Sequence, residues 1–518
     1  MKTRRLLSLV LSLILALPLS LAVAAPASAG VRDQVTYELE QGNYVFDPTT
    51  ATIVDCTVSR YVTDLVVPGQ LGGVQVKRID RKVFSGCDNL VTVTLPAGLM
   101  EIGDGAFGYC DNLTSINIPY GVTKIGAEVF SNCPKLASIS LPDTVTEVGN
   151  DLFLECTSLS SVRLSRNLKV MSNRMFKDCA ALTSIDIPDS VYYIGQECFR
   201  DTGLTSLSLS PSVNYIGKGV FYSCDDLVWV DLSQTTITED RLGDSVFYDC
   251  PSLVHVSLPA GLERIYGYTF ALCTALESLS IPEGVTEIWE GAFGGCSSLR
   301  TLILPSTLES VGMSCCSGND NMTIYFRGTM RDWGVLDTSL NNGDLLNASI
   351  HFAQSVAGFT DVADFDYYAD AVQWAVNAGV TTGTGANTFS PSAAVTRAQA
   401  VTFLWRAAGS PEPASASSPF TDVTDPSAYY YKAVLWAAQQ GITGGVGNNA
   451  FGLDNTLTYD QIFTFLCRAA GDTADGADWS AAAVNWANAN GLTDGLFFDA
   501  KLACPRCDLV YCLWKQMV

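Results

Sequence analysis

The sequence has few charged residues and almost no histidine, and both shortages exclude classes of function. Asp, Glu, Lys and Arg make up 16% of the 518 residues, against about 25% in a typical globular domain. Acidic residues outnumber basic ones by 53 to 30, and the resulting net charge of −23 at pH 7 repels phosphate backbones. His255 and His351 are the only histidines, too few for a histidine-rich metal site. We therefore expect no nucleic-acid partner and no metal.

The sequence also lacks the short motifs of the common enzyme classes. It contains no P-loop, HExxH, Gly-x-Ser-x-Gly or dinucleotide fingerprint, and Gly383-Thr-Gly385 lacks the lysine of a phosphate loop. The many Asp and Glu residues are scattered through a repeated pattern, where solvated positions are the default. We expect no enzyme activity and no cofactor. A hidden pair of carboxylates, as in a carbohydrate-active enzyme, stays open as an alternative.

Residues 1–29 are typical of a secretory signal. Basic residues at positions 2, 4 and 5 precede an apolar run over 6–25, and Ala27-Ser-Ala29 offers the small residues that a signal peptidase accepts. An uncleaved membrane anchor is the alternative, since the run approaches the length that spans a bilayer. Pro18 and the Ala-Ser-Ala exit favour cleavage, so we expect an exported chain without a transmembrane segment.

A repeat of about 23 residues fills the middle of the chain. Its marker is a phenylalanine, which recurs at positions 84, 107, 130, 153, 176, 199, 221, 247, 270 and 293. In each unit an alternating pair such as Ile116-x-Ile118, ended by Pro119, predicts a short strand, and Val122 to Ile125 predicts a second one. One such coil cannot bury its own apolar face, whereas stacked coils can. The pattern therefore predicts a solenoid of short parallel strands joined by helical turns.

Nine of the 17 cysteines share one column of the repeat, at positions 87, 110, 133, 156, 179, 224, 250, 273 and 296. A disulfide framework is the usual interpretation for an exported chain. Side chains at identical positions in successive coils point in parallel, however, so we expect a ladder of small buried thiols. Thr202 takes this position once.

The recurring Phe-x-x-Cys-x-x-Leu pattern resembles the BspA type of leucine-rich repeat, which is found on bacterial surface proteins. The resemblance covers residues 66–316 as about ten units, and the flanking segments look like the family's opening and closing caps. His351 then belongs to the closing cap. Most solvent-facing strand positions are Ser or Thr, which simply suits an exposed strand. The exceptions cluster in the central coils, and we expect them to bind an unknown protein or glycan: Arg163, Asp186, Trp229, Asp231 and His255.

A second, longer repeat begins near residue 358. The helix Ala371-Val-Gln-Trp-Ala recurs from Ala433 and from Ala483, and each copy ends at a glycine. Phe359-Thr-Asp-Val362, its second copy at 420–423 and Thr396-Arg-Ala-Gln399 resemble the S-layer homology (SLH) module. The resemblance implies an all-α bundle that anchors exported proteins non-covalently to anionic, often pyruvylated, secondary cell-wall polymers.

In the first module, Thr396 and Gln399 form a capping box, so a helix begins there with free backbone N–H groups. A helix N-terminus attracts anions, and Arg397 adds a charge with bidentate geometry for a carboxylate. Gly383 and Gly385 would let a sugar approach the backbone. The alternative is a surface arginine beside a capped helix, and the family resemblance favours the ligand role.

The other two modules depart from this pattern. The second keeps the capping box at Thr458 and Gln461 but has Tyr459 in place of the arginine. The third keeps Arg506, with Asp508 nearby, and loses the threonine cap. Its Cys504-x-x-Cys507 is a weak metal or redox signal, and a disulfide or two buried thiols fits better.

These observations predict a solenoid followed by an all-α bundle on the surface of a bacterium of the Gram-positive type, with the solenoid acting in adhesion or ligand capture. A structural surface-layer component is the alternative. The expected domains are a signal peptide (1–29), an N-terminal cap (30–65), repeats (66–316), a C-terminal cap (317–357), SLH 1 (358–410), a linker (411–419), SLH 2 (420–471) and a partial SLH 3 (472–518).

Overall fold

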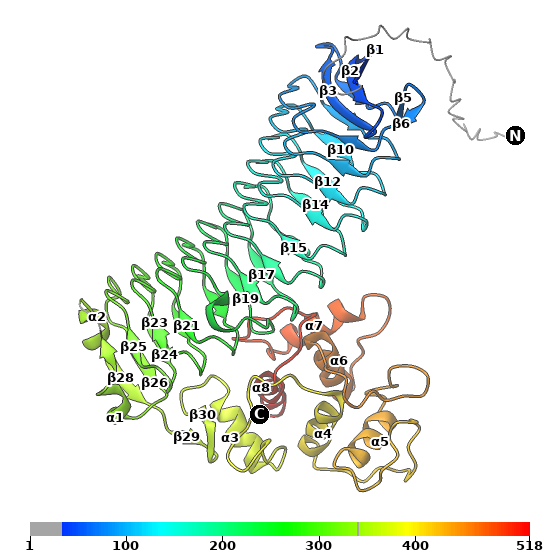
Figure 1. Cartoon of the computed structure of the whole chain (residues 1–518). Helices are drawn as coiled ribbons and strands as arrows, with labels where there is room; N and C mark the ends of the chain where they lie inside the picture. The colour runs from blue at the N-terminus through cyan, green and yellow to red at the C-terminus, as the bar shows by residue number, and fades with distance from the viewer. Residues whose placement is uncertain (1–33, 339–340) are drawn as a thin grey trace, which may run out of the picture.

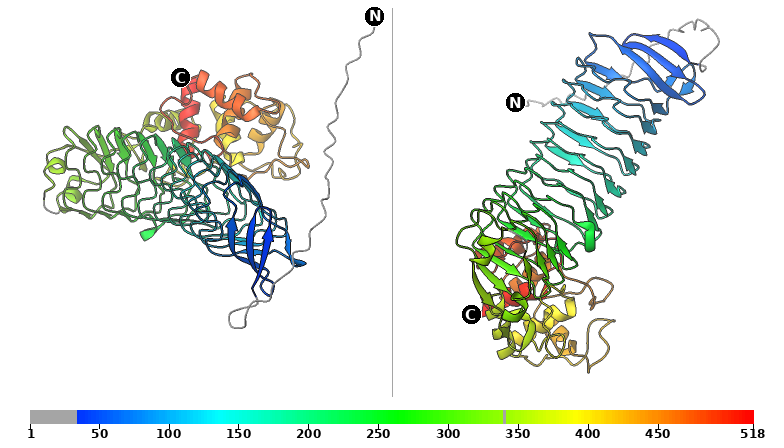
Figure 2. Two further views of the ribbon diagram at one scale, coloured as in Figure 1. Left: turned by 90° about the horizontal axis from the view of Figure 1, so that it is seen from above. Right: turned by 60° about the vertical axis from the view of Figure 1, so that its left-hand side comes forward.

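The computed structural model describes residues 34–338 and 341–518, so the predicted signal peptide lies outside the described residues. An elongated solenoid carries a helical domain packed against its side, as Figures 1 and 2 show from three directions. This arrangement confirms the predicted fold class, a leucine-rich-repeat solenoid followed by helices. Within the described ranges, no helix combines the length and the apolar character needed to cross a membrane.

One face of the solenoid is built from short parallel strands, one in nearly every coil, although residues 183–187 form none. Equivalent residues of successive coils pair directly, as Ser115 does with Thr92 and Trp229 with His255. The middle residue of each strand is apolar and points inward, and its neighbours point outward, as the period of two requires. The strands are β4 Asp64–Val66, β8 Thr92–Thr94, β10 Ser115–Asn117, β12 Ser138–Ser140, β14 Ser161–Arg163, β17 Ser206–Ser208, β19 Trp229–Asp231, β20 His255–Ser257, β22 Ser278–Ser280, β24 Thr301–Leu304, β26 Thr323–Phe326 and β28 Ser349–Phe352.

A second row of two-residue strands forms a neighbouring face, as the sequence predicts for Val122 to Ile125. The corners between the rows are turns rather than α-helices, with one 3-10 helix at Glu239–Arg241. The second row consists of β7 Arg78–Ile79, β9 Glu101–Ile102, β11 Lys124–Ile125, β13 Glu147–Val148, β15 Val170–Met171, β16 Tyr193–Ile194, β18 Tyr215–Ile216, β21 Arg264–Ile265, β23 Glu287–Ile288, β25 Ser310–Val311 and β27 Asp337–Thr338.

Both ends of the solenoid are covered. At the N-terminal end the antiparallel strands β1 (Val35–Leu39), β2 (Gly42–Asp47) and β3 (Thr52–Val58) close the stack, beside the small hairpin of β5 (Gln70–Leu71) and β6 (Val74–Gln75). At the other end lie α1 (Met330–Trp333) and α2 (Gly343–Leu346). His351 is on the last strand, β28, where its ring stacks on Tyr325. Capping matters because an open end would expose the apolar interior and unpaired strand edges.

The repeated phenylalanines form a continuous column through the core. Their rings lie in near-parallel stacks, with neighbouring centroids 5.1–6.1 Å apart in the first four coils, and all ten are fully buried. Each ring therefore packs on the ring of the coil before it and the coil after it. This column makes the stability of one coil depend on its neighbours.

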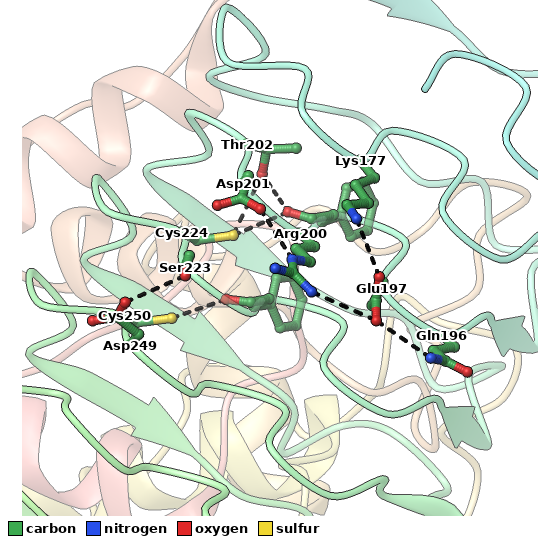
Figure 3. A network of polar contacts seen from close by, with 12 residues as sticks. Lys177, Gln196, Glu197, Arg200, Asp201, Thr202, Ser223, Cys224, Asp249 and Cys250 are labelled. Carbon is green, nitrogen blue, oxygen red and sulfur yellow. Dashed lines mark hydrogen bonds and ion pairs between the residues drawn. The ribbon is translucent and has the colours of Figure 1, made fainter. Parts of the chain in front are cut away.

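The cysteine column is a ladder of thiols, as predicted, and all 17 cysteines of the chain are unbridged. From Cys110 onward, each thiol in the column donates to the carbonyl oxygen of the phenylalanine in the preceding coil, as Cys224 does to Phe199 O over 3.0 Å. Cys250 makes the same contact to Phe221 O, and the Thr202 hydroxyl also bonds Phe199 O (Figure 3). Sulfur is therefore used as a small, buried hydrogen-bond donor.

Glycines after the second strand row allow the coils to approach each other. Gly126, which follows β11, does not have a left-handed backbone conformation. A Cβ on Gly126 would lie 2.6 Å from the backbone nitrogen of Asp104, and one on Gly149 would lie 2.2 Å from that of Ala127. These positions lack space for a side chain because the preceding coil's backbone fills it.

The helical domain follows the antiparallel pair β29 (Ser355–Val356) and β30 (Phe359–Ala363). Its three modules meet where their second helices begin. Val395 N–H bonds Cys504 O, Cys504 N–H bonds Leu457 O and Leu457 N–H bonds Val395 O, all at 2.9–3.0 Å. This closed triangle gives the domain an approximate threefold arrangement. Its helices are α3 Ala369–Asn377, α4 Arg397–Ala407, α5 Tyr431–Gln439, α6 Tyr459–Ala469, α7 Trp479–Ala489 and α8 Arg506–Met517.

Candidate functional site

The helix starts are capped as expected, but their backbone N–H groups are not free. Thr396 and Gln399 form the predicted capping box at α4. The N–H of Arg397 bonds Asn455 O and that of Ala398 bonds Leu453 O, both in the second module. The expectation of free N–H groups for an anion is therefore wrong, because the neighbouring module already satisfies them.

The Arg397 side chain is buried where the first and second modules meet, and we use the word cleft for this junction and for its two counterparts. Its guanidinium carbon is 5.1 Å from the ring centroid of Phe451 and 4.9 Å from that of Phe465. One terminal nitrogen donates to the hydroxyl of Thr443 and, at 3.5 Å, to Gly445 O. Two aromatic faces and a hydroxyl thus fix the plane of the guanidinium.

Arg506 occupies an equivalent cleft between the third and first modules. Its guanidinium carbon is 5.0 Å from the centroids of both Phe389 and Phe403, and Nη2 donates to Thr381 Oγ1 over 3.3 Å. Nε donates to Phe389 O at 2.9 Å. Gly383 belongs to this cleft rather than to that of Arg397, because its N–H bonds the same Thr381 hydroxyl. The two arginines therefore share one geometry.

Both guanidinium groups are buried without a carboxylate partner. Arg397 is 7% exposed and Arg506 is 3% exposed. Burial lowers the pKa of Arg397 to about 10, with a further contribution from Arg468, and also lowers the pKa of Arg506. Neither forms an ion pair within the described part of the chain, and Nε of Arg397 is buried without a hydrogen-bond partner. A buried cation without a hydrogen-bonded carboxylate favours an incoming anion.

The third cleft, between the second and third modules, has a different chemistry. Tyr459 takes the arginine position, and its ring lies 5.1 Å from that of Phe498. Its hydroxyl and that of Tyr367 donate to the buried carboxyl group of Asp508. Burial raises the pKa of Asp508. The structure therefore brings Asp508 to this cleft and to neither arginine, so its predicted role toward the polymer stays a prediction.

A lysine at the edge of this third cleft does not replace the missing arginine. Lys501 Nζ lies 2.6 Å from Asp460 Oδ2 and 2.9 Å from Ser480 Oγ. Asp460 is 1% exposed, so the lysine charge is neutralised by a fixed partner.

Several residues of the clefts were not predicted from the sequence. Gly445 and Thr443 correspond to Gly383 and Thr381, and aligning the Ile442-Thr-Gly-Gly stretch with Val380-Thr-Thr-Gly would have found them. Gly385 lies in a local turn, where its N–H bonds Thr388 O. In the third module, Cys504 and Cys507 are two buried free thiols, and burial raises the pKa of both.

The solenoid residues predicted to bind a ligand fall into two groups. Arg163 and Asp186 lie on the exposed face, and the Arg163 guanidinium pairs with Asp143 at 3.0 Å. Trp229 and His255 are half-buried and Asp231 is 6% exposed. The expectation that the second group faces solvent is wrong, because a loop of the third helical module lies against these strands.

That loop makes two defined contacts with the solenoid. The Phe497 ring stacks on His255, with centroids 4.2 Å apart and an 8° interplanar angle. Asp499 Oδ2 accepts a 2.6 Å hydrogen bond from Ser208 Oγ. Burial lowers the pKa of His255 to about 4. Burial also raises the pKa of Asp231, and the carboxylates of Asp508 and Asp499 add to the effect.

Comparison with known proteins identifies both repeats. The family model of the BspA type leucine-rich repeat region matches residues 77–205 and 192–323, and that of the S-layer homology domain matches 358–401 and 419–462. A cell surface protein of Thermoanaerobacter kivui is 33% identical over 163 residues, which are 31% of this chain and 21% of that protein. An endoglucanase of Bacillus sp. (strain KSM-635) is 33% identical over 111 residues, or 21% of this chain and 11% of that enzyme. The chain thus spans about a fifth or less of these curated relatives.

Two solved structures resemble the solenoid. A leucine rich cell surface protein from Faecalibacterium prausnitzii A2-165 is 23% identical, with 59% of this chain and 98% of that chain covered and a TM-score of 0.35. The pneumococcal vaccine antigen PcpA is 16% identical, with 63% and 100% covered and a TM-score of 0.41. Leucine-rich repeats and S-layer homology domains together fit a cell-surface protein that the latter anchor. The chain carries BspA-type leucine-rich repeats followed by S-layer homology domains.

Proposed function

We propose that this protein is exported by a bacterium of the Gram-positive type and held non-covalently on an anionic, pyruvylated wall polysaccharide by its SLH modules. The supporting observation is the pair of equivalent clefts in which Arg397 and Arg506 are buried without a carboxylate partner. Each guanidinium is already oriented by two aromatic rings and a threonine hydroxyl. An anion that enters such a cleft meets a desolvated charge, whose field is weakly screened.

A carboxylate matches these clefts in geometry as well as charge. The planar guanidinium pairs with a carboxylate through two parallel hydrogen bonds, and such charge-assisted bonds are about twice as strong as neutral ones. A pyruvate ketal on a sugar supplies a carboxylate of this kind. The Tyr459 cleft presents the acidic Asp508 instead of a cation, so we assign polymer binding to two clefts of the three.

We further propose that the solenoid acts in adhesion or ligand capture and that the chain is not an enzyme. Arg163 and Asp186 offer charged groups on an otherwise Ser- and Thr-rich exposed face. Leucine-rich repeats and SLH domains are non-catalytic surface modules. The partial match to an endoglucanase covers only 11% of that enzyme, which is too little to carry its activity over to this chain.

Co-sedimentation of the purified chain with wall sacculi tests the anchoring role. We expect the chain to pellet with intact sacculi and to lose at least about tenfold in affinity, roughly 1.4 kcal/mol, once hydrofluoric acid has removed the secondary polymer. Equal binding to intact and stripped sacculi would contradict the proposal. A mild acid treatment that removes only pyruvate ketals identifies the anionic group: retained binding in that arm would point to phosphate.

A further inference from the structure

The third SLH module differs from the other two in what its loop does. In the first two modules the segment between the helices contains Gly383-Thr-Gly and Gly444-Gly-Val, and it faces an arginine cleft. The third module instead has Leu496-Phe-Phe498, and Phe497 and Asp499 face the solenoid. The same module borders the cleft that has lost its arginine. The cleft beside the third module has therefore lost its arginine, and the loop of the same module has gained a contact with the solenoid.

We propose that the third module is a docking module, which holds the helical domain against strands β17, β19 and β20 of the solenoid. The Phe497 ring covers His255, and Asp499 accepts the hydrogen bond of Ser208 from the adjacent coils. The segment that covers this face of the solenoid therefore belongs to the same chain. It carries an aromatic residue, Phe497, two positions before an acidic one, Asp499. This inference does not depend on polymer binding.

A second contact makes the docking geometrically specific. Arg327, at the end of the solenoid, forms a bidentate ion pair with Asp366, just before α3. Phe365 packs against Tyr325 on β26, with ring centroids 4.9 Å apart. This contact lies where the chain enters the helical domain, so it fixes one point only. The Phe497 contact fixes a second point, far along the chain, so the domain can no longer pivot freely about the first.

Docking has a consequence for the solenoid's binding face. Asp231 and the half-buried Trp229 and His255 lie beneath the docked domain or at its edge, whereas Arg163 and Asp186 stay open. Any external ligand for the central strands has to compete with residues 497–499. The helical domain therefore masks part of the face that the sequence assigns to ligand binding.

The chain has only two histidines, which makes the test direct. In full-length protein with 13C-labelled histidine, NMR titration resolves one ring from His255 and one from His351. We expect the pKa of His255, about 4 when docked, to rise toward 6.5 in Phe497→Ala/Asp499→Ala. Small-angle X-ray scattering should show a larger radius of gyration for the same variant. Phe497 is 40% exposed, so its loss should leave the fold intact.

Two further variants make the outcome decisive. Ser208→Glu places a carboxylate opposite Asp499 from the solenoid side and should release the domain in the same way. Val66→Ser removes a 58% exposed apolar side chain from β4, near the N-terminal end of the solenoid, and should behave as wild type. The proposal is overturned if the pKa of His255 stays near 4, or if the radius of gyration stays unchanged, in both docking variants.

Discussion

A chain in which Arg397 and Arg506 are both replaced by methionine should lose about 100-fold or more in affinity for wall sacculi. A hydrogen bond to a charged group is worth about 1.5–3 kcal/mol, so each single variant should lose about tenfold or more. The two clefts act on one polymer, so their losses should combine. Methionine keeps an unbranched side chain between the phenylalanine rings and removes the charge together with its N–H donors.

Co-sedimentation measures this loss, and circular dichroism checks that the variants keep their helices. Arg→Lys variants at both positions should bind at an intermediate level, since lysine retains the charge without the planar fork. Lys432→Met is the matched control, because Lys432 pairs with Glu412 on the surface and should bind as wild type. A folded double variant that sediments like wild type would show that the polymer contacts other residues.

Replacing Phe176 by alanine should destabilise the solenoid by about 3–5 kcal/mol. The Phe176 ring is fully buried, with the rings of Phe153 and Phe199 at 5.4 and 5.7 Å. Its removal leaves a cavity in the middle of the column and breaks two stacking contacts at once. Because each coil contacts only its neighbours, the loss divides the solenoid into two shorter stacks.

Urea unfolding followed by circular dichroism measures the change in the free energy of unfolding. Tyr120→Ala is the control, since Tyr120 is 77% exposed and its loss should change stability by less than about 0.5 kcal/mol. If the Phe176→Ala chain unfolds at the same urea concentration as the Tyr120→Ala chain, stacking in the phenylalanine column does not stabilise the solenoid, and the prediction is wrong.

The solenoid was predictable because its information is local and repeated. Phe107, Cys110 and Leu113 recur at the same place in most coils, so one unit of the sequence predicts the others. The thiol ladder follows from the same argument, since parallel side chains cannot form disulfides with one another. What periodicity does not reveal is the acceptor of each thiol, the carbonyl of Phe84 for Cys110, which lies one coil away.

The arginine clefts were predictable only in part. The sequence points to Arg397 and Arg506, but it pairs Arg397 with Gly383 of its own module. In the structure the side chain of each arginine contacts another module. Arg506 donates to the hydroxyl of Thr381, 125 residues away, and the N–H of Gly383 bonds the same hydroxyl. Such pairing depends on how three modules close into a ring, which no single module encodes. The same closure gives the helix N–H groups of Arg397 and Ala398 their acceptors.

The covered solenoid face could not be predicted at all. Trp229, Asp231 and His255 stand at strand positions that alternate outward, and that part of the prediction is correct. Phe497 and Asp499, more than 240 residues later in the chain, contact His255 and Ser208 on the two strands that flank β19. Long-range docking between two separately encoded repeats leaves no periodic signal in either of them.

A crystal structure of the full chain with an oligosaccharide released from the wall polymer tests the central claim most directly. The account predicts an acidic sugar group at Arg397 and another at Arg506, with no sugar in the Tyr459 cleft. Sugar bound beside Tyr459 and Asp508, or bound only on the solenoid, would contradict it.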